Sequence, residues 1–549
     1  MKYTLPALLD NSFANYSQNI SLGFVGEESF TYSELKKEID SLIVILEKFG
    51  IEKGNKVAIL STNMPNWGIS FFALNYMGVI AVPILPDFHT KEIENIIIHA
   101  ECKALFVSSN LIHKLKDIKA DKLKTRILID NFNEIEIGED VNEVAIRFKN
   151  ADYNSSPKMD HTVEESDLAS IIYTSGTTGS SKGVMLTHKN IAYDAYHCES
   201  VYKVEPTDVM LSILPLSHSY ENTIGLVLPI ICGASVKYNK NPPTPTVLMA
   251  ALKEVRPTVM LTVPLIIEKI YKGKVLPNIN SKAITRTLYK FAPTRKLLNR
   301  VAGKKLYETF GGRLLFFGLG GAKVSAQVEQ FLMEAKFPYA IGYGLTETAP
   351  MLCGTSPFKG EFQSTGIPMT GIEIKINDPD PETGEGEVWA KGPNVMLGYY
   401  KEPELTKKVI TEDGWFKTGD LGIVSKAGDL HIRGRIKNMI VGSSGENIYP
   451  EEIESVINTY PYVLESLVLE RKGKLVAMVH LNMEELEKKF HELKMKQHEI
   501  EARLDEILKE IQLQVNGTVN KFSQLQIVLH QSSPFERTPT QKVKRFLYS

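Results

Sequence analysis

Cysteine is scarce in this 549-residue sequence, which has only Cys102, Cys198, Cys232 and Cys353 and no C-x-x-C pair. This excludes a disulfide framework and gives no sign of a structural zinc site. Charge of one sign is not in excess either, because 63 Lys and Arg face 65 Asp and Glu. A balanced charge does not favour nucleic acid as a partner. We expect reduced thiols and a cytoplasmic protein.

Long hydrophobic runs are also absent. No stretch approaches the roughly 18 consecutive apolar residues that a membrane-spanning helix needs, and the first residues lack the apolar core of a signal peptide. We therefore expect a soluble protein without a transmembrane segment. A contact with the membrane surface remains open, as does the oligomeric state.

What is present is the composition of an ordinary globular protein, with 43% hydrophobic and 23% charged residues. Residues 30–50 have helical apolar spacing and end at Gly50, a helix-stop signal. Short strand-like segments follow at 55–60, 102–109 and 123–130. Alternating helices and strands predict an α/β fold with largely parallel sheets. A later segment with many turn residues, 363–434, predicts a smaller β subdomain.

The pattern changes after about residue 435. Residues 438–482 predict a short α+β unit, and 483–514 predict one long or two short amphipathic helices, with Gln497 interrupting the stripe. The stripe consists of Leu486, Phe490, Leu493, Ile500, Leu504, Ile507 and Ile511. Packing on the sheet of the same domain is favoured over a coiled coil, because the heptads are few. The basic tail, FERTPTQKVKRFLYS, is expected to be exposed.

The strongest local motif is IIYTSGTTGSSKGVMLTH at 171–188. An apolar strand runs into seven residues that are only Thr, Ser or Gly, and Lys182 follows shortly after. Glycines let backbone N–H groups converge on an anion, hydroxyls donate further bonds and a lysine supplies charge. The spacing is neither that of a Walker A loop nor that of a dinucleotide fingerprint. We interpret it as a polyphosphate cradle; the alternative is a polar surface loop.

Two further segments have the composition of a nucleotide site. LFFGLGGAKV (315–324) places glycines directly after an apolar strand, so that a flat ligand could approach the backbone; a tight turn is the alternative. IGYGLTETAP (341–350) groups Tyr343, Thr346 and Glu347, which fit a base, a phosphate and a magnesium ion. Taken alone, that segment is better explained as an ordinary loop than as a site.

Three single residues are weaker candidates. His218 in LPLSHSYENT could face a ligand, although a histidine beside apolar residues is more often structural. Asp420 in WFKTGDLG could chelate a ribose diol or simply belong to a turn. Lys542 lies close to Lys544 and Arg545, where a solvated basic tail is the simplest interpretation.

The order of these motifs along the chain resembles the adenylate-forming (AMP-binding) superfamily. That group includes acyl-CoA synthetases, firefly luciferase and the adenylation domains of peptide synthetases. The resemblance rests on the Thr/Ser/Gly loop, GYGLTETAP, the TGD segment, the G-R-I-K junction at 434–437 and the late lysine, and it covers nearly the whole chain. LPLSHSYE, the F-x-R-T-P-T-x-K-x-K-R-F ending and the helical insertion most resemble long-chain fatty acid–CoA ligases.

The resemblance implies an architecture and a reaction. A large N-terminal domain, residues 1–434, would hold ATP and the acyl substrate in layered α/β subdomains plus a β subdomain. A small, mobile α+β domain, residues 435–549, would act as a lid and carry the helical insertion at about 483–514. A fatty acid would attack the α-phosphate of ATP with Mg²⁺, giving acyl-AMP and pyrophosphate. CoA would then displace AMP.

By the same resemblance, the nucleotide site is assembled from several segments. The β- and γ-phosphates would be held by Thr174, Ser175, Gly176, Thr177, Thr178, Gly179 and Lys182. The adenine slot and its surroundings would be formed by Gly320, Gly321, Ala322, Gly342, Tyr343 and Gly344. Thr346 would bind the α-phosphate, Glu347 with Thr174 the Mg²⁺, and Asp420 with Arg435 the ribose and phosphate.

The resemblance also assigns residues to the lid and the acyl pocket. Lys542 would reach the reacting carboxylate and the α-phosphate, a task that suits an ammonium on a long stem. Lys437 would be the hinge about which the lid turns to bring in the loop at 442–447. His218 would gate the acyl pocket. Gln541 stands where relatives commonly have glycine, and Val441 stands where some long-chain relatives have lysine.

Alternatives remain open at this point. The acid could be aryl or medium-chain, and the thiol acceptor could belong to a carrier protein instead of CoA. A luciferase-like monooxygenase would share the ATP motifs. A carrier-loading adenylation domain is disfavoured because no carrier domain follows. A non-catalytic nucleotide-binding scaffold is disfavoured by the presence of Lys542, Glu347 and Asp420.

Overall fold

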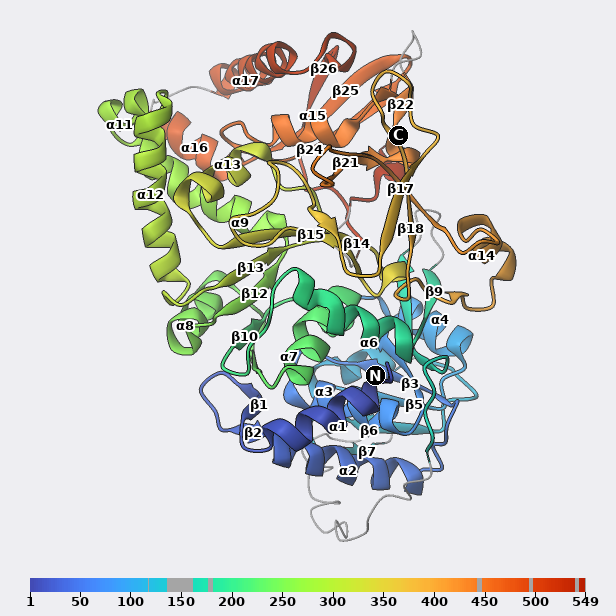
Figure 1. Ribbon diagram of the computed structural model, residues 1–549. Coiled ribbons are helices and arrows are strands. Elements are labelled where there is room, and N and C mark those ends of the chain that lie inside the picture. Colours follow the sequence, from blue (N-terminus) through green and yellow to red (C-terminus); the bar gives the residue numbers. More distant parts are fainter. Residues whose placement is uncertain are drawn as a thin grey trace.

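The computed structural model describes residues 1–116, 118–135, 161–175, 181–441, 447–492, 497–538 and 543–548. Two large, mostly parallel sheets dominate the first four hundred residues, and smaller sheets follow toward the C-terminus (Figure 1). The predicted α/β class is confirmed. Among the described residues no helix is both long and apolar enough to cross a membrane.

The first large sheet has nine strands. Its spatial order is β16 (Ile367–Pro368), β15 (Met351–Gly354), β14 (Tyr339–Gly344), β13 (Phe316–Leu319), β12 (Val259–Thr262), β10 (Val209–Ser212), β11 (Ser235–Tyr238), β1 (Ile20–Phe24) and β2 (Ser29–Thr31). The strands from β14 to β1 are parallel, and the outer strands at both ends are antiparallel. The carboxyl ends of β13 and β14 therefore open at one edge of this sheet.

The second large sheet has eight strands. Its order is β19 (Gly398–Tyr399), β9 (Ser181–Thr187), β8 (Leu168–Ser175), β4 (Ile80–Ile84), β3 (Lys56–Leu60), β5 (Ala104–Val107), β6 (Thr125–Leu128) and β7 (Asn133–Glu134). Its centre is parallel, whereas β8 and β9 form an antiparallel hairpin that β19 extends. The hairpin carries the predicted phosphate loop at its tip.

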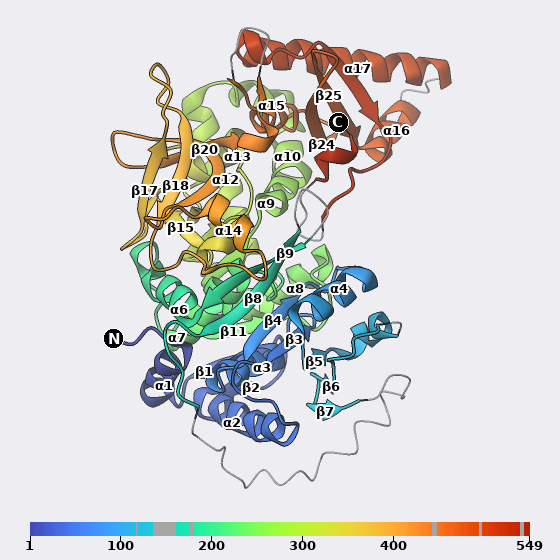
Figure 2. The same cartoon turned by 90° about the vertical axis from the view of Figure 1, so that its right-hand side faces the viewer.

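Helices separate and cover the two sheets. Between them lie α1 (Leu5–Tyr16), α2 (Tyr32–Lys48), α3 (Pro65–Tyr76), α6 (His188–His197) and α7 (Leu228–Ile231), whose apolar residues share one core with both sheets. The outer face of the eight-stranded sheet is covered by α4 (Thr90–Ala100). The outer face of the nine-stranded sheet is covered by α8 (Pro245–Val255), α9 (Pro264–Ile270), α10 (Leu276–Asn280), α11 (Ala283–Leu288), α12 (Ala292–Thr309) and α13 (Ala326–Ala335). Figure 2 shows these layers from the side.

Several local predictions are confirmed. The helix expected over 30–50 is α2, which begins with a capping box between Thr31 and Glu34 and is followed by Gly50 at φ 67°. The strands expected at 55–60, 102–109 and 123–130 are β3, β5 and β6. The β subdomain expected within 363–434 contains a four-stranded antiparallel sheet. It is formed by β17 (Glu373–Asn377), β18 (Gly386–Lys391), β20 (Phe416–Val424) and β21 (Leu430–Arg435), with α14 (Pro403–Val409) alongside.

The C-terminal part has its own sheets and core. It contains β22 (Ile440–Val441), β23 (Asn447–Ile448), α15 (Pro450–Ile457), β24 (Val463–Arg471), β25 (Lys474–Leu481), α16 (Met483–Glu492), α17 (Gln497–Thr518) and β26 (Ile527–Gln531). The helical insertion is two helices, and Leu486, Ile507 and Ile511 pack on the sheet of the same part, as favoured from the sequence. All the residues of that core follow position 439. The domain boundary at 434/435 stays a prediction.

The expectation of an exposed tail is wrong in two places. Phe535 is buried with Leu467, Leu469 and Met478 in a small core. Arg545 forms an ion pair of 2.6 Å with Glu454, whose backbone lies in α15. The tail is anchored because an aromatic side chain and a guanidinium find partners on the sheet and helix that precede them, which composition alone does not reveal.

Candidate active site

The predicted phosphate loop begins and ends on paired strands. In the β8–β9 hairpin, Thr174 pairs with Lys182 and Ser175 pairs with Ser181. The apolar strand that was expected to lead into the loop is therefore confirmed. Thr174 and Lys182 lie on the paired strands at the two ends of the loop. Residues 176–180, which include Gly176, Thr177, Thr178 and Gly179, lie outside the described residues.

Lys182 and Glu347 are brought together by a residue that the sequence analysis did not find, Tyr399. The hydroxyl of Tyr399 donates a hydrogen bond of 2.8 Å to Oε1 of Glu347. The ammonium of Lys182 lies 5.3 Å from the centre of the Tyr399 ring, within the range of a cation–π contact. Burial, followed by the nearby Glu347 carboxylate, raises the pKa of Tyr399, so its hydroxyl remains a donor.

The short turn Thr346–Thr348 that carries Glu347 is held from below by a buried network. The side-chain amide of Asn394 donates to the carbonyls of Thr348 and Met351 at 2.8 and 2.7 Å. The same amide donates to Oδ1 of Asp194, which is buried on α6. The turn is thus fixed on both sides, and Thr346 and Glu347 project from a rigid base.

Gly344 is required by a close backbone approach at the start of this turn. A Cβ on Gly344 would lie 1.8 Å from the carbonyl oxygen of Pro350, far below any tolerated contact. Gly342, two residues earlier on the same strand, has its nearest neighbouring atoms at 3.9 Å from such a Cβ. The two glycines of the IGYG segment therefore differ: only Gly344 is demanded by packing.

Asp420 forms the second polar cluster. It is 3% exposed, and its Oδ2 accepts a hydrogen bond of 2.6 Å from the hydroxyl of Tyr343. Its Oδ1 lies 2.7 Å from Nε of Arg435, because Asp420 on β20 and Arg435 on β21 are register partners. Burial and the adjacent Asp420 carboxylate raise the pKa of Tyr343 well above its ordinary value. Three residues predicted from separate motifs thus meet in one cluster.

The glycine segment after β13 meets a second aromatic residue. Cβ atoms built on Gly318 and Gly320 would lie 3.0 Å from atoms of the Tyr220 side chain. Gly321 has φ 82°, which favours glycine, and both Gly321 and Ala322 are exposed. A flat ligand can therefore approach Gly321 and Ala322 from the open side, while Tyr220 covers Gly318 and Gly320.

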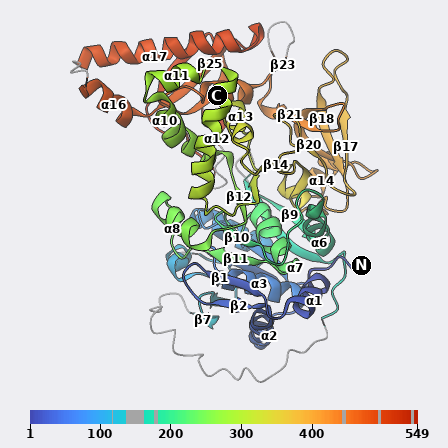
Figure 3. The same ribbon diagram turned by 60° about the vertical axis from the view of Figure 1, so that its left-hand side comes forward.

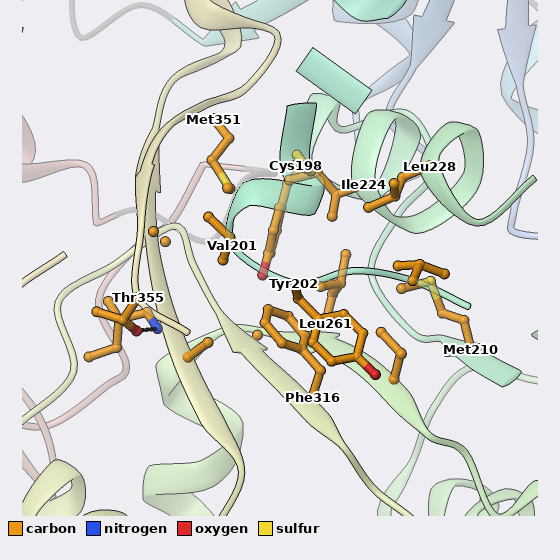
Figure 4. Close-up of a pocket in the computed structure, with 18 residues that line it drawn as sticks. Cys198, Val201, Tyr202, Met210, Ile224, Leu228, Leu261, Phe316, Met351 and Thr355 are labelled. Carbon is orange, nitrogen blue, oxygen red and sulfur yellow. Dashed lines mark hydrogen bonds between the residues drawn. The ribbon is translucent and has the colours of Figure 1, made fainter. Parts of the chain in front are cut away.

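An apolar pocket extends from these residues into the protein (Figure 4). It encloses about 500 Å³ not filled by atoms, including space open to solvent. Its walls are almost entirely apolar and include Tyr202, Ile224, Leu261, Phe316, Ala340 and Met351. Gly342, the neighbour of Tyr343, is among the lining residues. The pocket therefore adjoins the Asp420–Tyr343–Arg435 cluster along β14.

A buried carboxyl group lies on the same helix as Tyr220 and Ile224, which line this pocket. Glu221, in the π-helix Tyr220–Val227, is 1% exposed. Its Oε1 accepts a hydrogen bond of 2.5 Å from Ser212, and Ser212 accepts one of 3.1 Å from the side chain of Asn63. Oε2 of Glu221 has no hydrogen-bond partner. Burial raises the pKa of Glu221 to about 8, so at neutral pH it is mostly an uncharged acid.

His218 precedes this helix and is half-buried. Its backbone is tied down: its N–H donates to Pro215 at 3.0 Å and its carbonyl accepts from Asn222 at 2.8 Å. Its place two residues before Tyr220, which lines the pocket, is compatible with the predicted gate. The gate itself stays a prediction.

The predicted lid residues are only partly placed. Lys437 lies exposed in the turn Ile436–Asn438, which follows β21 and leads into the C-terminal part. Val441 ends β22 and is also exposed. Lys542 and Gln541 lie outside the described residues, as do 442–446.

Two groups of residues were missed by the sequence analysis. Tyr399 stands in a G-Y-Y segment without a recognisable motif, and Asn394 and Asp194 give no local signal. Glu221 did leave a signal, because it is the only acidic residue in the largely apolar stretch 209–238. A carboxyl group in such surroundings indicates a buried polar site.

The comparison with known families decides the identity. Residues 9–400 match the model of the family described as AMP-binding enzyme. The chain belongs to this family. It is 32% identical over 499 residues to long chain acyl-CoA synthetase 1 of Arabidopsis thaliana, covering 83% of this chain and 74% of that protein. It is 30% identical over 491 residues to the peroxisomal long chain acyl-CoA synthetase 6 of the same plant, covering 84% and 70%.

Solved structures of AMP-binding enzymes share the fold. One is the o-succinylbenzoate CoA synthetase of Bacillus subtilis in complex with its acyl-adenylate intermediate, at 22% identity and a TM-score of 0.75. The match covers 99% of this chain and 98% of that one. The whole chain, including its C-terminal part, therefore follows the architecture of the family.

The residues present also fit a magnesium ion held partly by a nucleotide. Among the described residues no group of three or more His, Cys, Asp or Glu could hold a metal. Magnesium is commonly bound by one or two protein oxygens plus substrate phosphates. The Glu347 carboxylate and the Thr174 hydroxyl are oxygens of this kind.

Proposed function

We propose that this AMP-binding enzyme activates a fatty acid with ATP and transfers it to CoA, as a long-chain fatty acid–CoA ligase that forms AMP and pyrophosphate. One observation carries the proposal: the apolar pocket reaches Gly342, and the next residue, Tyr343, holds Asp420. An apolar chain in the pocket would place its carboxylate beside a nucleotide bound at that cluster.

The residues then divide the work of the first half-reaction. Thr174, Ser175, Lys182 and the loop between them bind the β- and γ-phosphates. Gly320, Gly321, Ala322 and Tyr343 receive the adenine, and Asp420 with Arg435 receives the ribose. Thr346 binds the α-phosphate, and Glu347 with Thr174 holds the magnesium, which supplies charge compensation between two anions. Lys542 reaches the carboxylate and the α-phosphate.

The second half-reaction requires the part of the chain that follows the boundary near 434/435 to move relative to the part before it. The C-terminal part contacts the rest through polar side chains, among them Tyr449 with Glu385 at 2.6 Å and Lys323 with Glu452 at 3.6 Å. Contacts of this kind can be exchanged at little cost because they are replaced by water. We infer that Lys437 is the hinge about which this lid turns to withdraw Lys542 and admit the thiol of CoA.

The character of the pocket favours an aliphatic acid. Its lining is apolar almost throughout, and none of the lining residues that the structure describes is charged, so none would meet a second carboxylate. An aryl or medium-chain acid is the alternative, and a non-catalytic nucleotide-binding scaffold is the third candidate. The presence of Lys542 and Glu347 together with Asp420 favours catalysis over the scaffold.

The test is release of pyrophosphate and AMP from ATP with Mg²⁺ and a graded series of fatty and aryl acids, with and without CoA. We expect CoA-dependent turnover with long-chain acids and its loss in Lys542→Ala. Pyrophosphate release that does not respond to CoA would point to another acceptor, such as a carrier-protein thiol. No turnover with any acid by folded, ATP-binding protein would contradict the proposal.

We also infer that the enzyme works in a reducing, cytoplasmic compartment. Its four cysteines are unpaired, and three of them are buried as thiols. Its partners are small molecules, and its contact with the inner membrane face is peripheral.

A further inference from the structure

The segment from Ser281 to Thr309, which contains α11 and α12, has a charge unlike the rest of the chain. It carries eight Lys and Arg and one acidic residue, Glu308, whereas the whole chain has a net charge of −2. Figures 1 and 3 place α11 and α12 at the outside of the molecule, beyond the nine-stranded sheet. The positive charge is therefore gathered on one surface.

One face of α12 is firmly attached to the protein. Arg295 pairs with Glu334 of α13 at 2.8 Å, and Asn299 donates to the same carboxylate at 2.8 Å. A Cβ on Gly303 would lie 2.4 Å from Cβ of Ala335, so the two helices touch closely. The opposite face of α12 is left to the solvent.

That outer face carries large apolar side chains. Leu297 and Val301, one turn apart on α12, are 62% and 60% exposed. Phe291, just before α12, is 60% exposed, and Ile284 on α11 is 73% exposed. Scattered exposed leucines need no explanation, but these four large apolar residues fall within eighteen consecutive positions, and we call them the apolar patch.

Basic side chains flank the patch. Lys282 precedes α11, Arg286 lies on it and Lys290 follows it. Those on α12 are Lys296, Arg300, Lys304 and Lys305, and all seven are exposed. Within the described parts of the chain none of these seven forms an ion pair, in contrast to Arg295. On α12, the period of 3.6 residues puts Leu297 and Val301 between Lys296 and Arg300 on one side and Lys305 on the other.

We propose that α11 and α12 form a docking surface for a membrane that contains anionic phospholipid. A helix that lies in a membrane interface buries an apolar stripe among the acyl chains while its Lys and Arg meet the headgroups. The surface defined by Ile284, Phe291, Leu297 and Val301 with the flanking bases has both features. Charge complementarity selects the anionic lipid surface over a neutral one.

This surface deepens the proposed peripheral membrane contact and is independent of the ligase activity. The apolar pocket is lined by Val259, Leu261 and Phe316 on one face of the nine-stranded sheet, whereas α12 packs on the other face with Met260 and Phe317. Changes on the outside of α12 should therefore leave turnover of a dissolved acid intact. A loss of vesicle binding would therefore count against this surface, and a loss of turnover would count against the proposed ligase activity.

The test is flotation of the full-length protein with vesicles of phosphatidylcholine alone or with about one third phosphatidylglycerol. We expect binding to the anionic vesicles only, and weaker binding at high salt because the headgroup attraction is screened. Lys296→Glu/Arg300→Glu should lower the partition coefficient at least roughly tenfold. Leu297→Ser should also lower it, since an apolar anchor is lost.

Matched controls carry the same changes elsewhere. Lys407→Glu/Lys408→Glu on α14 and Ile98→Ser on α4 alter exposed residues away from this surface, and both should bind as the native protein does. Melting temperatures establish that all variants fold. The proposal is overturned if native protein ignores anionic vesicles, if the controls lose binding equally, or if Leu297→Ser binds normally. It is also overturned if Leu297→Ser dissociates a dimer and leaves vesicle binding unchanged, since the face would then belong to a second copy of this chain.

Discussion

Tyr343 donates a hydrogen bond of 2.6 Å to Asp420, although 77 positions separate the two residues. The bond joins the nine-stranded sheet to the four-stranded sheet of the β subdomain, since Tyr343 lies on β14 and Asp420 on β20. Arg435 completes the cluster from the last position of β21. The proposed nucleotide site therefore lies where two sheets meet, next to a residue that lines the apolar pocket, Gly342.

Removing the Tyr343 hydroxyl should weaken nucleotide binding. In Tyr343→Phe, the Asp420 carboxylate loses a donor that is buried beside it, and a hydrogen bond to a charged group is worth about 1.5–3 kcal/mol. We expect the KM for ATP to rise roughly tenfold or more, with a smaller change in kcat. Tyr193→Phe is the control, because that hydroxyl only reaches the backbone of Thr370 at 3.3 Å. An unchanged KM for ATP would show that Tyr343 does not contribute to nucleotide binding.

Two adjacent phenylalanines allow a test of the acyl pocket. Phe316 lines the pocket, whereas Phe317 points to the opposite face of β13 and packs under α13. Phe316→Leu and Phe317→Leu should each cost about 1–2 kcal/mol of stability. Only Phe316→Leu should change the profile of activity against acid chain length, because only it changes the pocket wall. Equal profiles for the two variants would place the acyl chain elsewhere.

Glu221 should make the stability depend on pH in a defined direction. Burial raises its pKa to about 8 in the folded protein from an ordinary value of 4.5, so between these values the folded state binds more protons than the unfolded state. The free energy of unfolding should therefore fall as pH rises from about 4.5 to about 8. One pKa unit corresponds to about 1.4 kcal/mol, which puts the total effect at a few kcal/mol.

The measurement is urea unfolding of native protein and Glu221→Gln at pH 5.5 and pH 8.5. The glutamine keeps an oxygen for the Ser212 hydroxyl and cannot ionise, so the variant should lose less stability at high pH. Parallel curves for the two proteins would mean that Glu221 is already ionised at pH 5.5.

The two glycines of the IGYG segment should respond differently to alanine. Gly344→Ala places a Cβ 1.8 Å from the Pro350 oxygen and must displace the turn that carries Thr346 and Glu347. Gly342→Ala meets only ordinary contacts at 3.9 Å. We expect Gly344→Ala to lose several kcal/mol of stability and Gly342→Ala to lose much less, as read from thermal melting. Equal melting temperatures would show that the turn can move freely.

The sequence by itself determined the fold class and the chemistry of the motifs. Periodicity located α2, β3, β5 and β6, because a capping box, a final glycine and short apolar runs are local signals. The Thr/Ser/Gly loop, the TET turn and the TGD segment could each be recognised as candidate binding segments from their own residues alone. Their order identified the family that the comparison then confirmed.

Only the tertiary structure decided which residues meet. No local pattern brings Tyr399 to Glu347, Asn394 to the turn beneath it, or Arg435 beside Asp420, since these contacts depend on strand register and on which sheets adjoin. The anchoring of Phe535 and Arg545 was missed for the same reason. The exposure of the apolar residues on α11 and α12 likewise depends on which face of α12 packs against α13. The sequence of a helix of mixed composition does not predict which face that is.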